Sequence, residues 1–367
     1  HEYTLRLTEP MRPLLYRCGY VDDWLQAAEA AVAAARQLGD PRRLAAALRN
    51  AGSVNMTVGR NALALAQLQE ALETLTSIQD RRGIAAHSVW LGYLAFRMGR
   101  CAEYLDRQWA ALRLFVELGD LRGEAMSRGL IGLYLWRLGR YREALEQERQ
   151  GLDRCAKIGD EDQVPDLLAF TALINDRLGH DEALRDAEQA LAGYELVGDR
   201  RGQTYALNII AMVQLRRGQP ATATPLLARA LDLIRAVGER RTEGHTTHLI
   251  GVAHRMLGRL DDAARDQERA LALARESGDP ALQAEVLNEI GRCRGAAGDQ
   301  REALRLHQQA ISLAETVGDP YLQAVFHWDA AAALAALGDA DAAGRHRAEA
   351  TTRFDALGLA PPAGTVT

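Results

Sequence analysis

Two histidines and two asparagines are the residues whose types and spacing could support a binding chemistry. The stretch HTTHLIGVAH places His245 and His248 three residues apart, so a helix would present both on one face, with His254 turned elsewhere. Two imidazoles could share a metal ion, but a complete site needs further ligands, and neither a cysteine nor a carboxylate joins the pair. We therefore predict no metal site. The pair either contacts a ligand carboxylate or is an exposed or hydrogen-bonded pair.

Asn208 and Asn288 carry side-chain amides, which combine a donor and an acceptor. Such an amide can pair with both unpaired groups of an extended peptide backbone. The alternative is that both residues face solvent or cap local backbone groups. The sequence leaves these two interpretations open.

Motifs for catalysis are missing from the sequence. It contains no GxSxG, no HExxH and no GxGxxG that follows a strand pattern. A Walker A loop needs a lysine beside serine or threonine, whereas the only lysine, Lys157, is followed by Ile158. We expect no enzymatic activity and no cofactor.

The composition predicts a water-soluble, cytoplasmic protein. The net charge is −5, and acidic and basic residues alternate along the chain, which does not favour a nucleic-acid backbone as partner. No apolar run is long enough to span a bilayer. The four cysteines lie far apart with no CxxC pair, which argues against a zinc knuckle or a disulfide framework.

A unit of 40 residues, once 39, recurs along the chain and must position these side chains. Each unit contains two loops marked by glycine, which favours two helices of about 16 to 18 residues. At the loop that joins one unit to the next, an acidic residue follows the glycine and is placed to cap the next helix. These pairs are Gly39-Asp40, Gly119-Asp120, Gly159-Asp160, Gly198-Asp199, Gly238-Glu239, Gly278-Asp279 and Gly318-Asp319, with Gln79-Asp80 in the remaining place.

A small residue stands seven positions before each loop glycine inside a unit. Glycine inside a helix costs about 1 kcal/mol relative to alanine, so its recurrence at one position needs a compensating gain. We expect that gain to come from close backbone approach of the two helices. The positions are Gly52, Gly92, Gly132, Ala172, Ala211, Gly251, Gly291 and Ala331.

This pattern, clearest in LGYLAFRMGR and IGLYLWRLGRYREAL, resembles the tetratricopeptide repeat in a 40-residue variety. The resemblance covers residues 20–357 and departs from the pattern at Tyr104 and Pro165. It implies an all-α fold, a right-handed α-solenoid of antiparallel helix hairpins. We expect a partial repeat over 1–38, eight hairpins over 39–357 and a tail over 358–367.

The resemblance also implies that the first helix of each hairpin lines a concave groove. Related arrays use asparagines near Asn208 and Asn288 to hold a peptide backbone. For Tyr93, Phe96 and Trp136 the alternative is ordinary packing between repeats. The groove residues that we expect to bind a protein or peptide are Tyr93, Phe96, Trp136, Tyr205, Asn208, His245, His248, Arg255, Asn288, Arg292 and Trp328.

The Ala- and Arg-rich array, with LGDPRRLAAALRNAG near its start, further resembles the C-terminal sensor region of bacterial transcription activators. These are the antibiotic-regulatory (SARP-type) and STAND NTPase proteins, whose NTPase and DNA-binding domains would lie upstream of a chain that begins at His1. The predicted function is a protein- or peptide-binding regulatory domain, without direct contact to nucleic acid or membrane. The alternative is a stand-alone scaffold or a receptor for signalling peptides.

Overall fold

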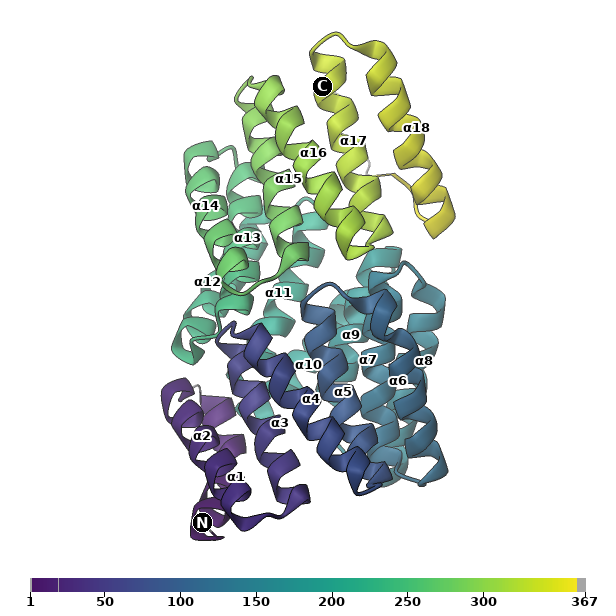
Figure 1. The fold of residues 1–367 in the computed structure, drawn as a ribbon. Helices are drawn as coiled ribbons and strands as arrows, with labels where there is room; N and C mark the ends of the chain where they lie inside the picture. The colour runs from purple at the N-terminus through teal and green to yellow at the C-terminus, as the bar shows by residue number, and fades with distance from the viewer. Residues whose placement is uncertain (1, 19, 362–367) are drawn as a thin grey trace.

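The computed structural model describes residues 2–18 and 20–361, and the described residues are almost entirely helical (Figure 1). Successive helices pack as antiparallel pairs, which confirms the predicted all-α solenoid. Residues 362–367 of the expected tail lie outside the described part. The helices are α1 (Glu2–Cys18), α2 (Val21–Leu38), α3 (Pro41–Thr57), α4 (Asn61–Ser77), α5 (Arg81–Arg97), α6 (Cys101–Glu117), α7 (Leu121–Arg137), α8 (Tyr141–Ile158), α9 (Val164–Leu178), α10 (Glu182–Leu196), α11 (Arg200–Arg216), α12 (Pro220–Val237), α13 (Arg240–Met256), α14 (Leu260–Glu276), α15 (Pro280–Ala296), α16 (Gln300–Val317), α17 (Pro320–Ala336) and α18 (Ala340–Leu357).

Most of the acidic residues that follow a loop glycine cap the next helix. The Asp120 carboxylate accepts a hydrogen bond of 3.0 Å from the backbone N–H of Gly123. Glu239 and Asp160 differ. The Glu239 side chain makes no cap hydrogen bond at the start of α13, and Asp160 does not cap α9, because that helix begins only at Val164 after an N-cap at Gln163. At Gln79 a non-glycine residue adopts the left-handed backbone conformation, with φ of 55°, where the other loops of this kind use glycine.

The glycines in the middle of first helices leave room for a side chain of the second helix. A methyl group on Gly132 would overlap the carboxyl of Glu148 in α8, and one on Gly92 would overlap the amide of Gln108 in α6. The predicted cause, close approach of the two backbones, is therefore wrong for these positions. The interaction that compensates for a glycine inside the helix is instead a hydrogen bond from the second helix. Gln108 Nε2 donates this 2.9 Å bond to the carbonyl oxygen of Ser88 on the first helix.

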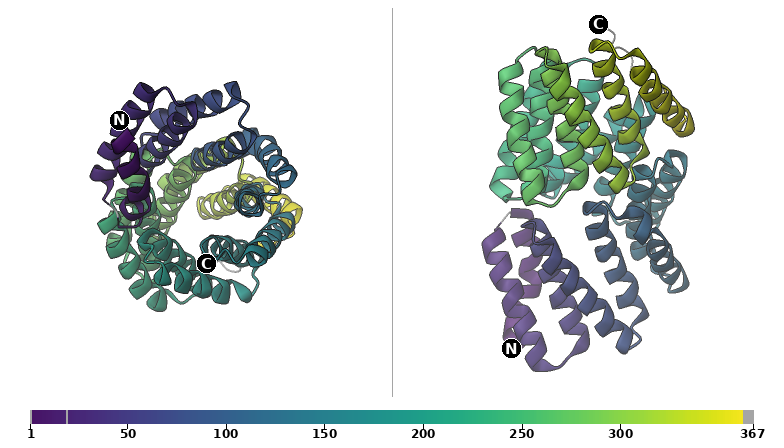
Figure 2. Two further views of the ribbon diagram at one scale, coloured as in Figure 1. Left: turned by 90° about the horizontal axis from the view of Figure 1, so that it is seen from below. Right: turned by 45° about the horizontal axis from the view of Figure 1, so that its top comes forward.

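The helix pairs follow one another around a ring, and the chain then passes over its own beginning (Figure 2). In Figure 1, α13–α18 consequently lie above α3–α8. We call the contact between these two turns the turn-to-turn seam. It joins residues 59–61, 97–99 and 137–139 of the lower turn to residues 239, 276–280, 317–320 and 357 of the upper turn.

Polar groups that are half-buried or fully buried hold the turn-to-turn seam together. Asn61 Nδ2 donates a 2.9 Å hydrogen bond to the carbonyl oxygen of Ser277, and Arg137 Nη1 lies 3.2 Å from Asp319 Oδ2. The coil is thus closed by contacts between residues far apart in the sequence.

Within the described residues we find no helix with the length and apolar character that crossing a membrane would require.

Candidate functional site

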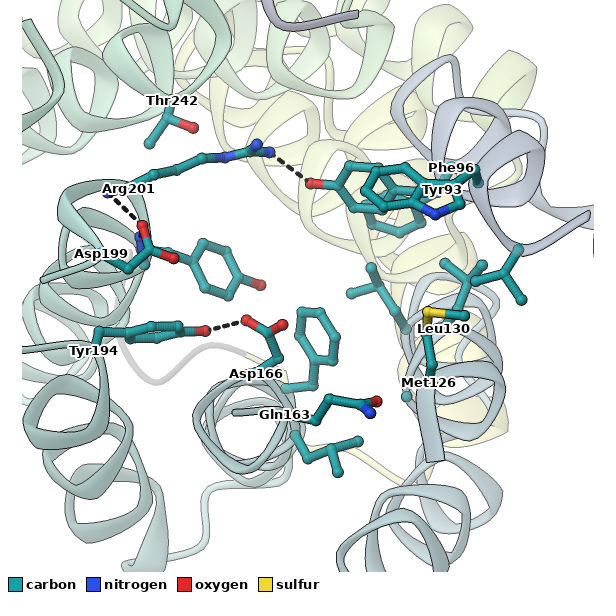
Figure 3. Close-up of a pocket in the computed structure, with 18 of the residues that line it drawn as sticks. Tyr93, Phe96, Met126, Leu130, Gln163, Asp166, Tyr194, Asp199, Arg201 and Thr242 are labelled. Carbon is teal, nitrogen blue, oxygen red and sulfur yellow. Dashed lines mark hydrogen bonds between the residues drawn. The ribbon is translucent and has the colours of Figure 1, made fainter. Parts of the chain in front are cut away.

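A cavity of about 270 Å³ lies on the inner side of the coil, between the first helices of consecutive hairpins (Figure 3). It is enclosed by α5 and α7 on one side and by α9, α11 and α13 on the other, with Tyr194 of the second helix α10 added to that second side. Its lining residues are Val89, Trp90, Tyr93, Phe96, Met126, Gly129, Leu130, Leu133, Gln163, Asp166, Leu167, Phe170, Tyr194, Asp199, Arg201, Gly202, Tyr205, Arg241 and Thr242.

The wall made by α5 and α7 is apolar. Val89, Tyr93 and Phe96 recur at intervals of three and four residues, so one face of α5 points into the coil. Leu130 and Leu133 form the matching face of α7. Figure 3 shows the side chains of Phe96, Leu130 and Met126 gathered on this side. This wall can bury aliphatic or aromatic groups of a ligand.

The opposite wall carries a carboxylate among aromatic rings. Tyr194 Oη donates a 2.5 Å hydrogen bond to Asp166 Oδ1, and the rings of Phe170 and Tyr205 meet edge to face with centroids 6.1 Å apart. The Asp166 side chain is exposed to the cavity, and partial desolvation by the protein around the cavity raises the pKa of its carboxyl. Burial likewise raises the pKa of the Tyr194 hydroxyl well above its ordinary value.

Arg201 crosses the upper rim of the cavity and links it to the turn-to-turn seam. Its Nη2 donates a 2.9 Å hydrogen bond to Tyr93 Oη on the far wall, and its Nε lies 3.3 Å from Glu239 Oε2. Glu239 also lies 3.3 Å from Arg97 Nη1 of the lower turn, and both side chains are fully buried. Although burial opposes it, Arg201 and Arg97 lower the pKa of Glu239 to about 2.

Arg241 and His245 share a second buried carboxylate beside this rim. Arg241 Nε lies 2.7 Å and His245 Nε2 lies 3.1 Å from Asp279 Oδ2. Burial works against ionisation of Asp279, but Arg241 and His245 prevail and lower its pKa. The two arginines that line the cavity are therefore both paired with carboxylates of the protein.

The structure brings three of the predicted groove residues together in the cavity, namely Tyr93, Phe96 and Tyr205. Trp136 does not line it. Its side chain is buried in the core, with the guanidinium groups of Arg137 and Arg177 at 5.0 and 5.1 Å from the ring.

Both asparagines are hydrogen-bonded to the neighbouring first helix. Asn208 Nδ2 donates to Thr246 Oγ1 at 2.9 Å, and Asn288 Nδ2 donates to Asp329 Oδ2 at 2.6 Å. Asn288 also accepts a 2.7 Å hydrogen bond from His307 Nδ1. Their amides are engaged between repeats in this structure, so a role in holding a peptide backbone stays a prediction.

The remaining predicted residues lie along the upper turn, outside the cavity. Arg292 Nη2 lies 2.8 Å from Asp329, and Arg255 pairs with Glu289. The guanidinium of Arg347 stacks 3.7 Å from the Trp328 ring.

His248 and His245 have separate partners, because His248 Nδ1 lies 2.9 Å from Gln267 Oε1 whereas His245 contacts Asp279. Over the described ranges, no group of three or more histidine, cysteine or carboxylate side chains is arranged to hold a metal ion.

Comparison with known proteins identifies the repeat. Models of the tetratricopeptide repeat match residues 125–158 and 242–316. The chain carries tetratricopeptide repeats. No curated protein matches its sequence.

Solved tetratricopeptide-repeat structures share the fold. A Rap protein complexed with competence and sporulation factor is 15% identical, covers 86% of this chain and 98% of its own, and has a TM-score of 0.58. The Rap conjugation gene regulator of plasmid pLS20, in complex with the Phr* peptide, is 14% identical over 75% of each chain, with a TM-score of 0.64. A STAND protein with a tetratricopeptide repeat sensor, from Pyrococcus horikoshii, is 14% identical with a TM-score of 0.50. That match covers 91% of this chain and 53% of the STAND protein.

Several lining residues were not predicted from the repeat pattern. Tyr194 belongs to a second helix, α10, whereas the pattern assigns the groove to first helices. Asp166, Arg201 and Arg241 lie in the first turns of α9, α11 and α13, six to ten residues before the small residue in the middle of each helix. A signal was present for Asp166, because Pro165 marks where α9 begins.

Proposed function

We propose that this chain is the sensor or autoinhibitory domain of a multidomain bacterial transcriptional regulator, and that it binds a protein or peptide segment in the cavity. The observation that carries the proposal is the cavity itself, an apolar and aromatic pocket with one open carboxylate on the inner face of a tetratricopeptide-repeat coil. Pockets of this kind bury ligand side chains and orient them through a few polar groups.

The link to the seam supports a regulatory role. Arg201 contacts Tyr93 inside the cavity and Glu239 in the turn-to-turn seam, so a ligand that displaces the Arg201–Tyr93 hydrogen bond also disturbs the contact between turns. A ligand that prefers one winding of the coil shifts the population toward it. Upstream NTPase and DNA-binding domains of the same chain would detect this change.

A receptor for signalling peptides is the second candidate. It is favoured by the two Rap structures, which are described in complex with a competence and sporulation factor and with the Phr* peptide. The regulatory domain and the peptide receptor would both bind their ligand in the cavity. In the receptor, the bound peptide alone would be the signal. A stand-alone scaffold would need neither the upstream domains nor a change in winding.

Binding of fluorescein-labelled pentapeptide pools, measured by fluorescence anisotropy, tests the cavity. We expect at least one pool to bind, and Leu130→Asp to weaken that binding tenfold or more, because a charge would enter the apolar wall. As the matched control, Leu196→Asp changes an apolar residue of α10 that is 83% exposed and does not line the cavity. Equal loss in both variants, or no binding of any pool, would contradict the proposal.

The reading frame of the native gene separates the candidates. An NTPase domain encoded directly upstream of His1 supports the regulator. A frame that begins at this array favours the peptide receptor or the scaffold.

A further inference from the structure

The charges around the cavity are unequally compensated. Arg201 pairs with Glu239, and Arg241 pairs with Asp279. The Asp199 carboxylate accepts hydrogen bonds from the backbone N–H groups at positions 201 and 202, both 3.0 Å long, and thereby caps α11. Each of these charged groups thus has an oppositely charged side chain or backbone hydrogen-bond donors of the protein as its partner.

Asp166 is the exception. Among the residues that the structure describes, no ion pair reaches its carboxylate, and its hydrogen bond comes from a neutral group, Tyr194 Oη, at 2.5 Å. Its position in the first turn of α9 favours a negative charge, which explains why the helix tolerates it. That position does not explain why the side chain projects into the cavity, between Tyr194 and the side of Leu130 and Met126 (Figure 3).

Aromatic rings surround this carboxylate. Tyr194, Phe170 and Tyr205 line the cavity beside it, and their rings offer negative faces to a cation. A carboxylate with aromatic rings beside it can recognise an ammonium or guanidinium group, because charge-assisted hydrogen bonds and cation–π attraction then act on the same cation.

The apolar wall suits the stem of such a cation. Lysine and arginine bury three or four methylene groups along apolar surface while the charged end reaches a polar partner. Val89, Leu130 and Leu133 supply that surface opposite Asp166. A cavity of about 270 Å³ is also suited to one long side chain rather than to a whole folded segment.

We propose that the cavity binds a cation on an apolar stem, an arginine or lysine side chain of the peptide or protein ligand, with Asp166 as its counter-ion and the Phe170, Tyr194 and Tyr205 rings around it. This inference rests on the proposed function, since it names the group that the ligand inserts. The same chemistry is offered by a free small amine, and the experiment separates the two sources.

The test compares acetylated, amidated pentapeptide pools that are identical except at the central residue. That residue is arginine, lysine or norleucine, and norleucine matches the apolar stem without the charge. We expect the arginine or lysine pool to bind the wild-type chain at least tenfold more tightly than the norleucine pool. Asp166→Asn should reduce this preference to below threefold and leave the affinity for the norleucine pool unchanged.

Two further variants separate charge from folding. Asp166→Glu keeps the negative charge and should retain most of the preference, which shows that Asp166→Asn acts through charge. Glu161→Gln removes a carboxylate from the exposed loop before α9 and should retain the full preference. Melting curves of all variants establish that each is folded.

The outcomes distinguish this inference from the proposed function. Binding of the norleucine pool as tight as that of the arginine and lysine pools, or a preference that survives Asp166→Asn, overturns the cation site and leaves peptide binding intact. Agmatine or cadaverine binding that depends on Asp166, without binding of any peptide pool, supports the cation site with a free amine as the source and overturns peptide binding. If neither a peptide pool nor a free amine binds, both the cation site and the proposed peptide binding are overturned.

Discussion

At the scale of single residues, Glu148 is a buried carboxyl group in an environment that disfavours its ionisation. Its side chain is fully buried against Gly132, and neither carboxyl oxygen has a hydrogen-bond partner in the described structure. Gln108 and Gln267 occupy the same place in other hairpins, and each donates a 2.9 Å hydrogen bond to a carbonyl oxygen of the first helix. Burial, assisted by the nearby Asp166, raises the pKa of Glu148 well above its ordinary value.

Glu148→Gln is therefore expected to stabilise the protein at pH 8 by about 1–3 kcal/mol, because the amide can donate a hydrogen bond at any pH, whereas the buried carboxyl can donate one only while it holds a proton. The folded wild-type chain retains a proton that the unfolded chain releases near pH 4.5. Its stability accordingly falls as the pH rises from that value through the raised pKa.

Urea unfolding at pH 5 and pH 8 measures this effect, and the Gln variant should lose less stability between the two. The reciprocal variant, Gln108→Glu, should introduce the same pH dependence into α6. Equal pH dependence in the wild type and in Glu148→Gln would refute this account.

At the scale of the helix pair, the mid-helix glycine and the side chain that covers it form one unit. Gly132→Val is expected to cost about 1–3 kcal/mol through overpacking. Because a side chain occupies the space, Gly132→Ala should cost less in a Glu148→Ala background than in the wild type. Thermal unfolding of the four chains of this cycle gives the coupling. Strictly additive effects would show that the backbones themselves are in contact.

Interactions that are local in the sequence were the ones that the sequence could predict. The cap of Asp120 on Gly123 spans three residues, and the inward face of α5 follows from helical spacing alone. The hydrogen bond between Asn288 and Asp329 was missed because it joins residues 41 apart, in different repeats. Asp166 of the first helix α9 contacts Tyr194 of the second helix α10. The repeat pattern assigns only first helices to the groove, so it could not predict the contribution of Tyr194.

At the scale of the whole molecule, the turn-to-turn seam depends on buried charges. Arg97 and Glu239 are fully buried, so removing one partner leaves the other with less compensation. Glu239 keeps Arg201, and we expect Arg97→Met to cost about 1–3 kcal/mol and to loosen the coil. Small-angle X-ray scattering should then report a larger radius of gyration than in the wild type.

The control for this prediction is Arg81→Met, which removes an exposed arginine that pairs with Glu117 on the surface. It should change neither the radius of gyration nor the stability by more than about 1 kcal/mol. An unchanged radius of gyration in Arg97→Met would show that the seam does not hold the coil closed. The seam was not predictable from the repeat pattern, because it depends on the twist accumulated over several hairpins.

The loops of the two turns meet in constant register. A side chain on Gly99 would contact Val317 and Pro280, and one on Gly139 would contact Leu357 and Pro320. Each pair is the other shifted by one 40-residue unit, so both loops are separated from their counterparts by the same number of units. An open solenoid can gain or lose an internal unit and remain intact. Here such a change would shift the loops of one turn relative to their counterparts in the other. We therefore expect duplication or loss of units to be tolerated only beyond the overlapping part of the coil.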